Sequence, residues 1–182
     1  TALRAGLDVA HDDGILATGT FGSGATGNLP TGAGTRLMWI PAKAAFRAGT
    51  ALFDEWNAGS VGNYSVAMGY NTTASGEAST ATGTSARASG QHSTAMGYDT
   101  RASNLASTAL GYQTNASGEY STATGFLSTA SGQYATAMGY QTTASAAFST
   151  AMGYQTSATA GGPRPLGKCT TASGQYATAM GS

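Results

Sequence analysis

The chain of 182 residues has few charged side chains, one cysteine and four prolines. Its eight basic residues are balanced by eight acidic ones, so it lacks the basic surface that electrostatic binding to nucleic acid requires. The single cysteine, Cys169, excludes an internal disulfide framework and a cysteine-rich zinc site. No run of about 18 apolar residues could span a bilayer, and no basic leader with an apolar core is present. We therefore expect membrane attachment only through regions outside this chain.

Small side chains make up most of the sequence. Ala (36), Thr (28), Gly (27) and Ser (19) together account for 110 of the 182 residues. Four prolines without a three-residue period exclude collagen. Composition alone would favour low-complexity disorder, so the order of the residues decides between disorder and a fold.

The order is periodic, with a repeat of 14 residues from residue 65 to residue 182. The copies begin at Ser65, Ser79, Ser93, Ser107, Ser121, Ala135, Ser149, Pro163 and Ala177. Glycine holds the fifth position of all nine copies, and alanine holds the tenth position of the eight complete ones. Even the copy PRPLGKCTTASGQY keeps this register. A disordered segment has no physical reason to keep a constant period over this length. The repeat therefore predicts a β-solenoid of eight full coils and a partial ninth.

Fourteen residues are too few for two helices and suit a coil of two short strands and two turns. Small residues at positions 1, 3 and 5, and at positions 8, 10 and 12, predict a thin coil interior. Position 4 would then point outward, and it carries large apolar groups. We expect this column to be an interface between chains, because monomers rarely expose such a patch. Its members are Met68, Met96, Leu110, Met138, Met152, Leu166 and Met180. The alternative is a wider monomeric β-helix with the methionines inside and the alanines outside.

Aromatic residues are confined to two further columns. Position 6 holds Tyr70, Tyr98, Tyr112, Phe126, Tyr140 and Tyr154, and position 14 holds Tyr120, Tyr134, Phe148 and Tyr176. Stacking of successive rings explains both columns, and an exposed adhesive stripe is the functional alternative for position 6. Threonines at position 2 raise a third possibility, an ice-binding hydroxyl lattice, although methionine at position 4 breaks any Thr-x-Thr pair in the copies that carry it.

The copies SVAMGYNTTASG, STAMGYDTRAS and STALGYQTNASG resemble the YadA-like head repeats of trimeric autotransporter adhesins. The resemblance covers residues 65–182 and departs from the family where Thr82 and Thr124 replace the apolar residue of position 4. It implies a left-handed parallel β-roll, three chains around one axis (a homotrimer), and an extracellular location on a bacterial surface, anchored in the outer membrane. Similar repeats occur in bacteriophage tail fibres, so a virion fibre or spike that contacts a host receptor is the alternative.

Residues 1–64 differ from the repeats, since they hold nine of the 16 charged residues and both tryptophans. Two short apolar segments flank an Asp-Gly turn at His11-Asp12-Asp13-Gly14, which predicts a hairpin. A glycine-rich loop follows, and RLMWIPAKAAFRAG predicts a second strand pair interrupted at Pro41. We interpret residues 1–64 as a β-rich cap that protects the end of the solenoid.

The sequence offers little reactive chemistry. The G-x-G-x-x-G match at residues 22–27 is followed by Asn28-Leu29-Pro30 and not by a helix, so a plain loop is favoured over a nucleotide site. The acidic residues around His11 could meet at a cation, but turn-forming preferences explain them equally. Cys169 has no nearby base, and scattered Glu77, Asp99 and Glu119 do not form a glycosidase pair.

We therefore expect no catalytic site, no cofactor and no metal. The sequence favours a non-enzymatic structural and adhesive module that attaches to a host, a surface or other cells through an unidentified ligand.

Overall fold

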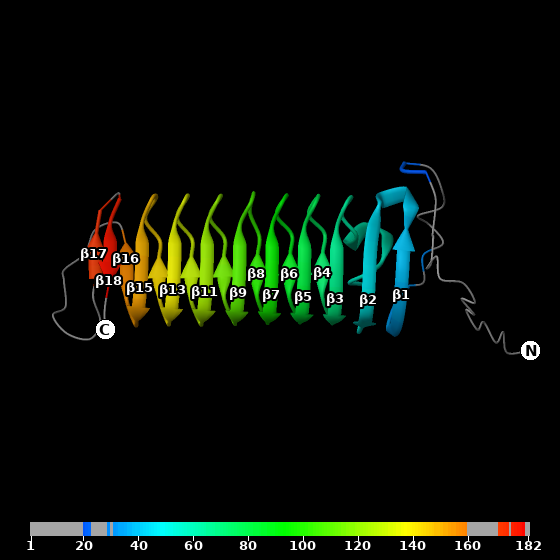
Figure 1. Ribbon diagram of the computed structural model, residues 1–182, viewed down its shortest axis with the longest axis horizontal. Helices are drawn as coiled ribbons and strands as arrows, with labels where there is room; N and C mark the ends of the chain where they lie inside the picture. Colours follow the sequence, from blue (N-terminus) through cyan, green and yellow to red (C-terminus); the bar gives the residue numbers. More distant parts are fainter. Residues whose placement is uncertain (1–19, 23–28, 30, 160–170, 175, 181–182) are drawn as a thin grey trace, which may run out of the picture.

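The computed structural model describes residues 20–22, 29, 31–159, 171–174 and 176–180. Two sheets, parallel apart from the first strand, lie along an elongated rod (Figure 1). The first layer is a ten-stranded sheet whose strands are β1 (Gly34–Ile40), β2 (Ala45–Ala51), β3 (Val66–Tyr70), β5 (Thr80–Thr84), β7 (Thr94–Tyr98), β9 (Thr108–Tyr112), β11 (Thr122–Phe126), β13 (Thr136–Tyr140), β15 (Thr150–Tyr154) and β18 (Thr178–Met180).

The second layer is an eight-stranded sheet of short strands. They are β4 (Thr73–Ala74), β6 (Arg87–Ala88), β8 (Arg101–Ala102), β10 (Asn115–Ala116), β12 (Thr129–Ala130), β14 (Thr143–Ala144), β16 (Ser157–Thr159) and β17 (Thr171–Ser173). The chain alternates between the two layers, so each coil contributes one strand to each. The predicted all-β solenoid of 14-residue coils is confirmed, with seven complete coils from β3 to β16.

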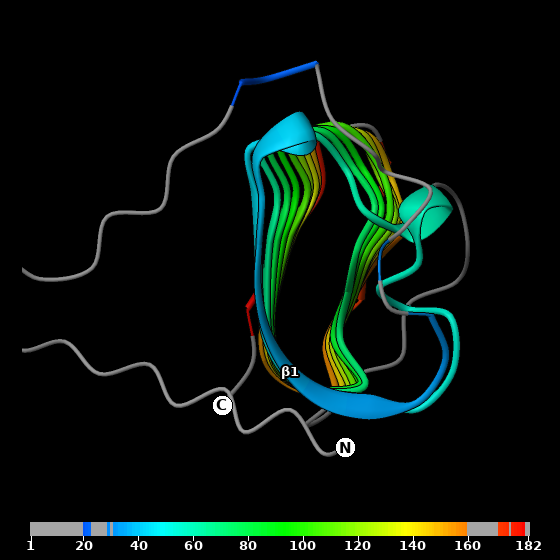
Figure 2. The same ribbon diagram turned by 90° about the vertical axis from the view of Figure 1, so that its right-hand side faces the viewer.

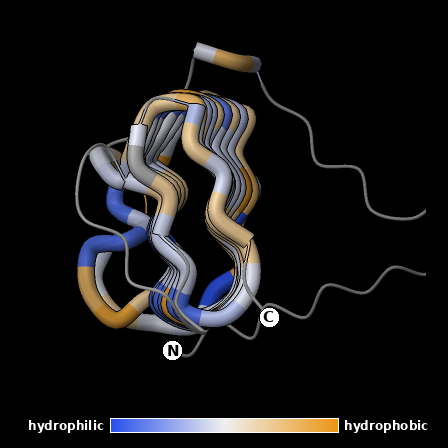
Figure 3. Tube along the Cα trace, turned by 90° about the vertical axis from the view of Figure 1, so that its left-hand side faces the viewer, coloured by the Kyte–Doolittle hydropathy of each residue, from blue (hydrophilic) through white to orange (hydrophobic). Residues whose placement is uncertain are grey.

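Successive coils pair in parallel with no shift of register. Ala123, for example, lies opposite Ala109 on one side and Ala137 on the other. Seen along the rod, the coils therefore superpose on one another (Figures 2 and 3). Because every coil has the same length, residues at the same position form columns along the axis.

The interior consists of small side chains, as the repeat predicts. Alanines at positions 3 and 10, such as Ala95 and Ala102, are fully buried and form one continuous cluster. Serines at position 1 are buried as well, and most donate their hydroxyl to the carbonyl three residues earlier, as Ser121 does to Gly118 at 2.7 Å. The alternative with methionines inside and alanines outside is excluded, because Met96 is 43% exposed and Ala95 is 0% exposed.

Both turns of each coil place a residue in the left-handed region of φ. Positions 7 and 14 have φ close to +50°, as in Gln113 (φ 50) and Tyr120 (φ 56). The N–H of Gln113 donates to the carbonyl of Tyr98 in the preceding coil at 2.7 Å, and that of Tyr120 donates to Leu105 at 2.8 Å. The hydrogen bonds between coils thus offset the conformational strain of non-glycine residues at these turns.

The prediction of a strand pair interrupted at Pro41 is confirmed. Strands β1 and β2 are antiparallel, and a short 3₁₀ turn, η2 (Pro41–Lys43), joins them. Strand β2 also pairs in parallel with β3, so the ten-stranded sheet continues across residues 64 and 65. A second 3₁₀ turn, η3 (Ala58–Ser60), precedes the first coil. The expected hairpin around His11, with its acidic residues, lies outside the described residues.

The prediction of eight full coils, with Leu166 in the position 4 column of the eighth, is wrong. Strand β15 pairs directly with β18, and Met152 lies opposite Met180, so the ladder has no place for Leu166 between them. In the other sheet, β16 pairs with β17. The solenoid therefore passes from the seventh copy to the ninth in the larger sheet, and not through eight full coils. The sequence explains this, because Pro163 and Pro165 have no N–H to donate to a central strand. Leu166 and Cys169 themselves lie outside the described residues.

Candidate functional site

The outward face of the ten-stranded sheet carries a column of exposed apolar side chains at position 4. Strand alternation turns positions 2, 4 and 6 away from the buried alanines. The exposed fractions at position 4 are 41% for Met68, 43% for Met96, 41% for Met138, 37% for Met152 and 69% for Met180. Leu110 is half-buried in the same column. The structure thus brings these predicted interface residues together in one line, and their role as an interface stays a prediction.

The apolar column does not end with the repeats. In β1, Leu37 lies opposite Ala48 of β2, which in turn lies opposite Met68 of β3. Leu37 is 76% exposed, and Trp39, two residues further on the same face, is 45% exposed. The sequence reasoning missed both residues, although the alternation in Thr35-Arg36-Leu37-Met38-Trp39 was a usable signal. The exposed apolar line therefore extends from β1 to β18, with smaller residues at Ala48, Thr82 and Thr124.

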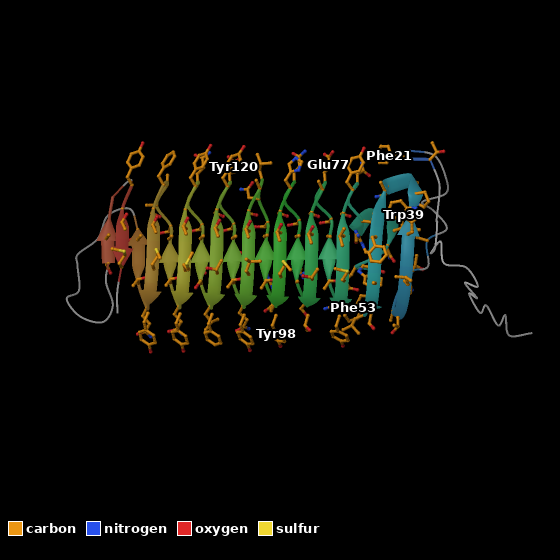
Figure 4. All side chains as sticks on the ribbon, in the orientation of Figure 1. Phe21, Trp39, Phe53, Glu77, Tyr98 and Tyr120 are labelled. Carbon is orange, nitrogen blue, oxygen red and sulfur yellow. The ribbon has the colours of Figure 1, made fainter. Side chains whose placement is uncertain are left out.

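Rings stack along one edge of the larger sheet. At position 6, Tyr98, Tyr112, Phe126, Tyr140 and Tyr154 have centroid separations of 4.8–5.0 Å and interplanar angles of 3–8°. Figure 4 shows this row of rings at the edge where Tyr98 is labelled. Because each ring covers the next, the ladder presents ring edges and hydroxyls to solvent. Tyr70 belongs to the same column but is separated from Tyr98 by Thr84.

The second aromatic column lies at the opposite edge (Figure 4, near Tyr120). Tyr120, Tyr134, Phe148 and Tyr176 stack with centroid separations of 4.9–5.0 Å. Further toward the N-terminus, Phe21 stacks on Tyr64 at 4.8 Å. The predicted stacking is thus present at both edges, and a binding role for the position 6 stripe remains a prediction.

A buried arginine closes the interior at the N-terminal side of the first coil. Arg47 lies opposite Ala67, so it occupies the alanine column of position 3, and its side chain is fully buried. Its guanidinium donates to the carbonyls of Phe46, Ser65 and Ala74 and to the Ser65 hydroxyl, at 2.7–2.9 Å. Burial lowers the pKa of Arg47 to about 10, which leaves it charged at neutral pH.

A buried tryptophan completes this region. The indole N–H of Trp56 donates to the carbonyl of Thr72 at 2.9 Å, and Trp56 packs in a cluster with Met38, Ile40 and Val61. The sequence reasoning did not single out either Arg47 or Trp56. The signal was available for Arg47, because AFRAG in residues 45–49 has the same pattern as SVAMG in residues 65–69, with arginine in place of the inward alanine.

Replacement of Arg47 by Ala is expected to lower the free energy of unfolding by about 2–4 kcal/mol. The change leaves a cavity and removes the donors of four hydrogen bonds, so exchange of the β2 and β3 amides with solvent should accelerate. Urea unfolding and hydrogen exchange measure both effects. Arg101→Ala is the control, because the Arg101 side chain is 58% exposed and its loss should change stability by less than about 0.5 kcal/mol. Equal stability of the two variants would contradict the role assigned to Arg47.

Within the described ranges, no three His, Cys, Asp or Glu side chains gather where they could hold a metal ion. The same part of the chain contains no helix that is long and apolar enough to cross a membrane. The motif at residues 22–27 lies almost entirely outside the described residues.

A family model described as the YadA head domain repeat matches residues 60–86, 88–105, 102–128 and 130–162. These segments span the seven complete coils except residues 87 and 129, and together they cover more than half of the chain. No curated protein matches the sequence.

Proposed function

Because the chain belongs to the YadA head domain family, we propose that it is a non-enzymatic adhesive module that works as a homotrimer. In this proposal three left-handed rolls stand side by side around one axis. The module is exposed on a bacterial surface, and regions outside this chain attach it to the outer membrane. The family supports an adhesin-like structural role, and the geometry of the exposed face supports the assembly.

The single observation that carries the proposal is the exposed position 4 column. Met68, Met96, Met138 and Met152 are each 37–43% exposed on a sheet whose interior side is filled by alanine. The coil interior buries little apolar area per residue, so burial of this column adds stabilisation of about 25 cal/mol per Å². A symmetric trimer would cover the column on every chain with the same column of its neighbours.

The N-terminal segment fits a cap on this assembly. We propose that residues 1–64 act as the cap and residues 65–182 as the head. Arg47 and Trp56 fill the interior next to the first coil. The antiparallel strand β1 ends the otherwise parallel sheet and pairs with the edge of β2 that faces away from the coils.

The ligand contacts in this proposal come from the aromatic stripe at position 6. Tyr70, Tyr98, Tyr112 and Tyr154 are 40–47% exposed at the edge of the sheet, away from the centre of the position 4 column. Tyrosine supplies contact area and a hydroxyl group with little loss of conformational entropy. Three chains would present three equivalent stripes, and simultaneous contact through them would add avidity.

Adhesion of coated beads tests the function. Beads that carry the chain should be retained on at least one of three layers, namely epithelial cells, bare glass or beads with the same coating. Retention should exceed that of albumin-coated beads by at least tenfold, because several stripes engage together. Beads with equal numbers of a monomeric variant, Met96→Asp/Met138→Asp, should lose most of this retention. Retention no higher than albumin on all three layers would overturn the adhesive role.

A further inference from the structure

The position 6 ladder has one missing rung, at Thr84. Where the ladder is complete, Tyr112 lies between Tyr98 and Phe126 at centroid distances of 4.8 and 4.9 Å, and both of its ring faces are covered. The strand register places Thr84 between Tyr70 and Tyr98 in the same way. A threonine side chain is far smaller than a ring, so the two tyrosines border a slot one coil wide.

Exposure of the bordering rings agrees with this slot. Tyr70 is 46% exposed and Tyr98 is 47% exposed, whereas Tyr112 and Tyr140 inside the ladder are 40% and 38% exposed. No described ring stacks on Tyr70, and Tyr98 has a stacking partner on one face only. Each of the two tyrosines therefore turns an uncovered face toward the slot.

Elsewhere in the chain, a tyrosine ring stacks on an aromatic ring that is distant in the sequence. At the other edge, Phe21, which lies outside the repeats, stacks on Tyr64 at 4.8 Å with an interplanar angle of 17°. That separation equals the rung spacing between Tyr98 and Tyr112. A ring that belongs to no coil can thus take the place of a rung.

Two arginines follow the slot along the chain, at the start of β6 and β8 of the eight-stranded sheet. Arg87 is three residues after Thr84 in the same coil, and it lies opposite Arg101 of the next coil. Adjacent like charges destabilise a sheet, and Arg101 has an ion pair with Asp99 at 3.8 Å, while Arg87 has none with any described residue. Arg87 is exposed and free to pair with an anion. Because Asp99, directly after Tyr98, is paired with Arg101, the unpaired charge of this part of the chain is the positive charge of Arg87, which favours a negatively charged ligand.

We propose that the slot between Tyr70 and Tyr98 binds one planar aromatic ring that carries an acidic group. The ring takes the place of the missing rung and stacks on both tyrosines, and its carboxylate pairs with Arg87. The ligand class is a small aromatic acid. This site is formed within a single chain, so it does not depend on the trimer or on the adhesive role.

Titration with 2-naphthoate, followed by its fluorescence and by saturation-transfer NMR, tests the site. The unaltered chain should bind one equivalent saturably below about 1 mM. Thr84→Tyr fills the rung and should lower the affinity at least tenfold. Thr84→Ala keeps the slot open and should bind as the unaltered chain does. Ser131→Tyr adds the same ring to the outward face of the other sheet and should leave binding unchanged.

A second comparison tests the acidic group. The neutral analogue 2-naphthalenemethanol should bind more weakly than 2-naphthoate, and Arg87→Gln should remove this difference. Circular dichroism confirms that each variant is folded before it is titrated. Absence of saturable binding by the unaltered chain, or equal affinity in Thr84→Tyr, would overturn the site. Equal affinity for the acid and the alcohol in the unaltered chain would overturn the role of Arg87.

Discussion

Gly111→Ala is expected to lower the free energy of unfolding by more than about 4 kcal/mol, enough to prevent folding of a marginally stable chain. Gly111 has φ +123, and a Cβ there would lie far inside van der Waals contact with the carbonyl oxygen of Gly125 in the next coil. The obstacle is backbone, which cannot rotate aside. Every described position 5 glycine of the complete coils also has a positive φ, so the sheet cannot accommodate the change by a local shift. Urea unfolding followed by circular dichroism measures the effect.

Gly118→Ala is the matched control, since it adds the same methyl group at position 12. A Cβ at Gly118 would also meet a backbone carbonyl oxygen, that of Gly132 in the next coil, so the steric obstacle is the same at both glycines. The difference is that Gly118 has no positive φ, and position 12 already holds Asn104 and Ala146 in other coils. At Asn104 the backbone has adjusted, because its N–H donates to the Ser107 hydroxyl at 3.2 Å instead of to a carbonyl of the next coil. We expect a loss of about 1–2 kcal/mol for this variant. If the two glycine variants were equally stable, the conformational requirement at position 5 would be contradicted.

Met96→Asp/Met138→Asp is expected to convert the proposed trimer into folded monomers. Burial of an unpaired carboxylate costs several kcal/mol, and a three-fold assembly would bury six of them in one column. The single chain tolerates the change, because both methionines are more than 40% exposed in it. Sedimentation equilibrium measures the mass of the assembly, and circular dichroism reports whether the coils remain folded.

Ser131→Asp is the control for the methionine variant. Ser131 is exposed on the outward side of the eight-stranded sheet, so one added charge there should leave the oligomer intact. A variant with both methionines replaced that kept the mass of the unaltered protein would show that the position 4 column is not the interface.

The repeat allowed most of the fold to be predicted, because small residues hold nearly every inward position. Ala95 and Ala102, and the glycine of position 5, follow from the 14-residue register and the two-residue alternation of strands. The antiparallel pair around Pro41 was also predictable, since a proline interrupts an otherwise apolar alternating segment.

The remaining features could not be predicted, because the residue types of the repeat alone do not determine them. Leu166 matches the apolar residue expected at position 4 of the repeat, but Pro163 and Pro165 lack the backbone N–H donors that a central strand needs. Tyr120 and Leu127 adopt φ values of 56° and 54°, which residue preferences assign to Gly and Asn. Arg47 was missed because a charged residue is expected at the surface, whereas here four oxygen atoms surround it in the interior.

Of the candidate binding features, the aromatic columns could be predicted from the sequence and the slot at Thr84 could not. The aromatic columns follow from the sequence, because in-register coils must bring residues 14 apart together. The slot at Thr84 is a property of the stacked geometry, since only the ring spacing shows that one absent ring leaves room for another.

The most direct test of the central claim is the mass of the unaltered chain in solution, measured by sedimentation equilibrium over a wide range of concentrations. The account predicts an assembly of three times the 18.0 kDa chain mass, because only association covers the exposed column from β1 to β18. A stable, folded species of 18.0 kDa at all concentrations would contradict it.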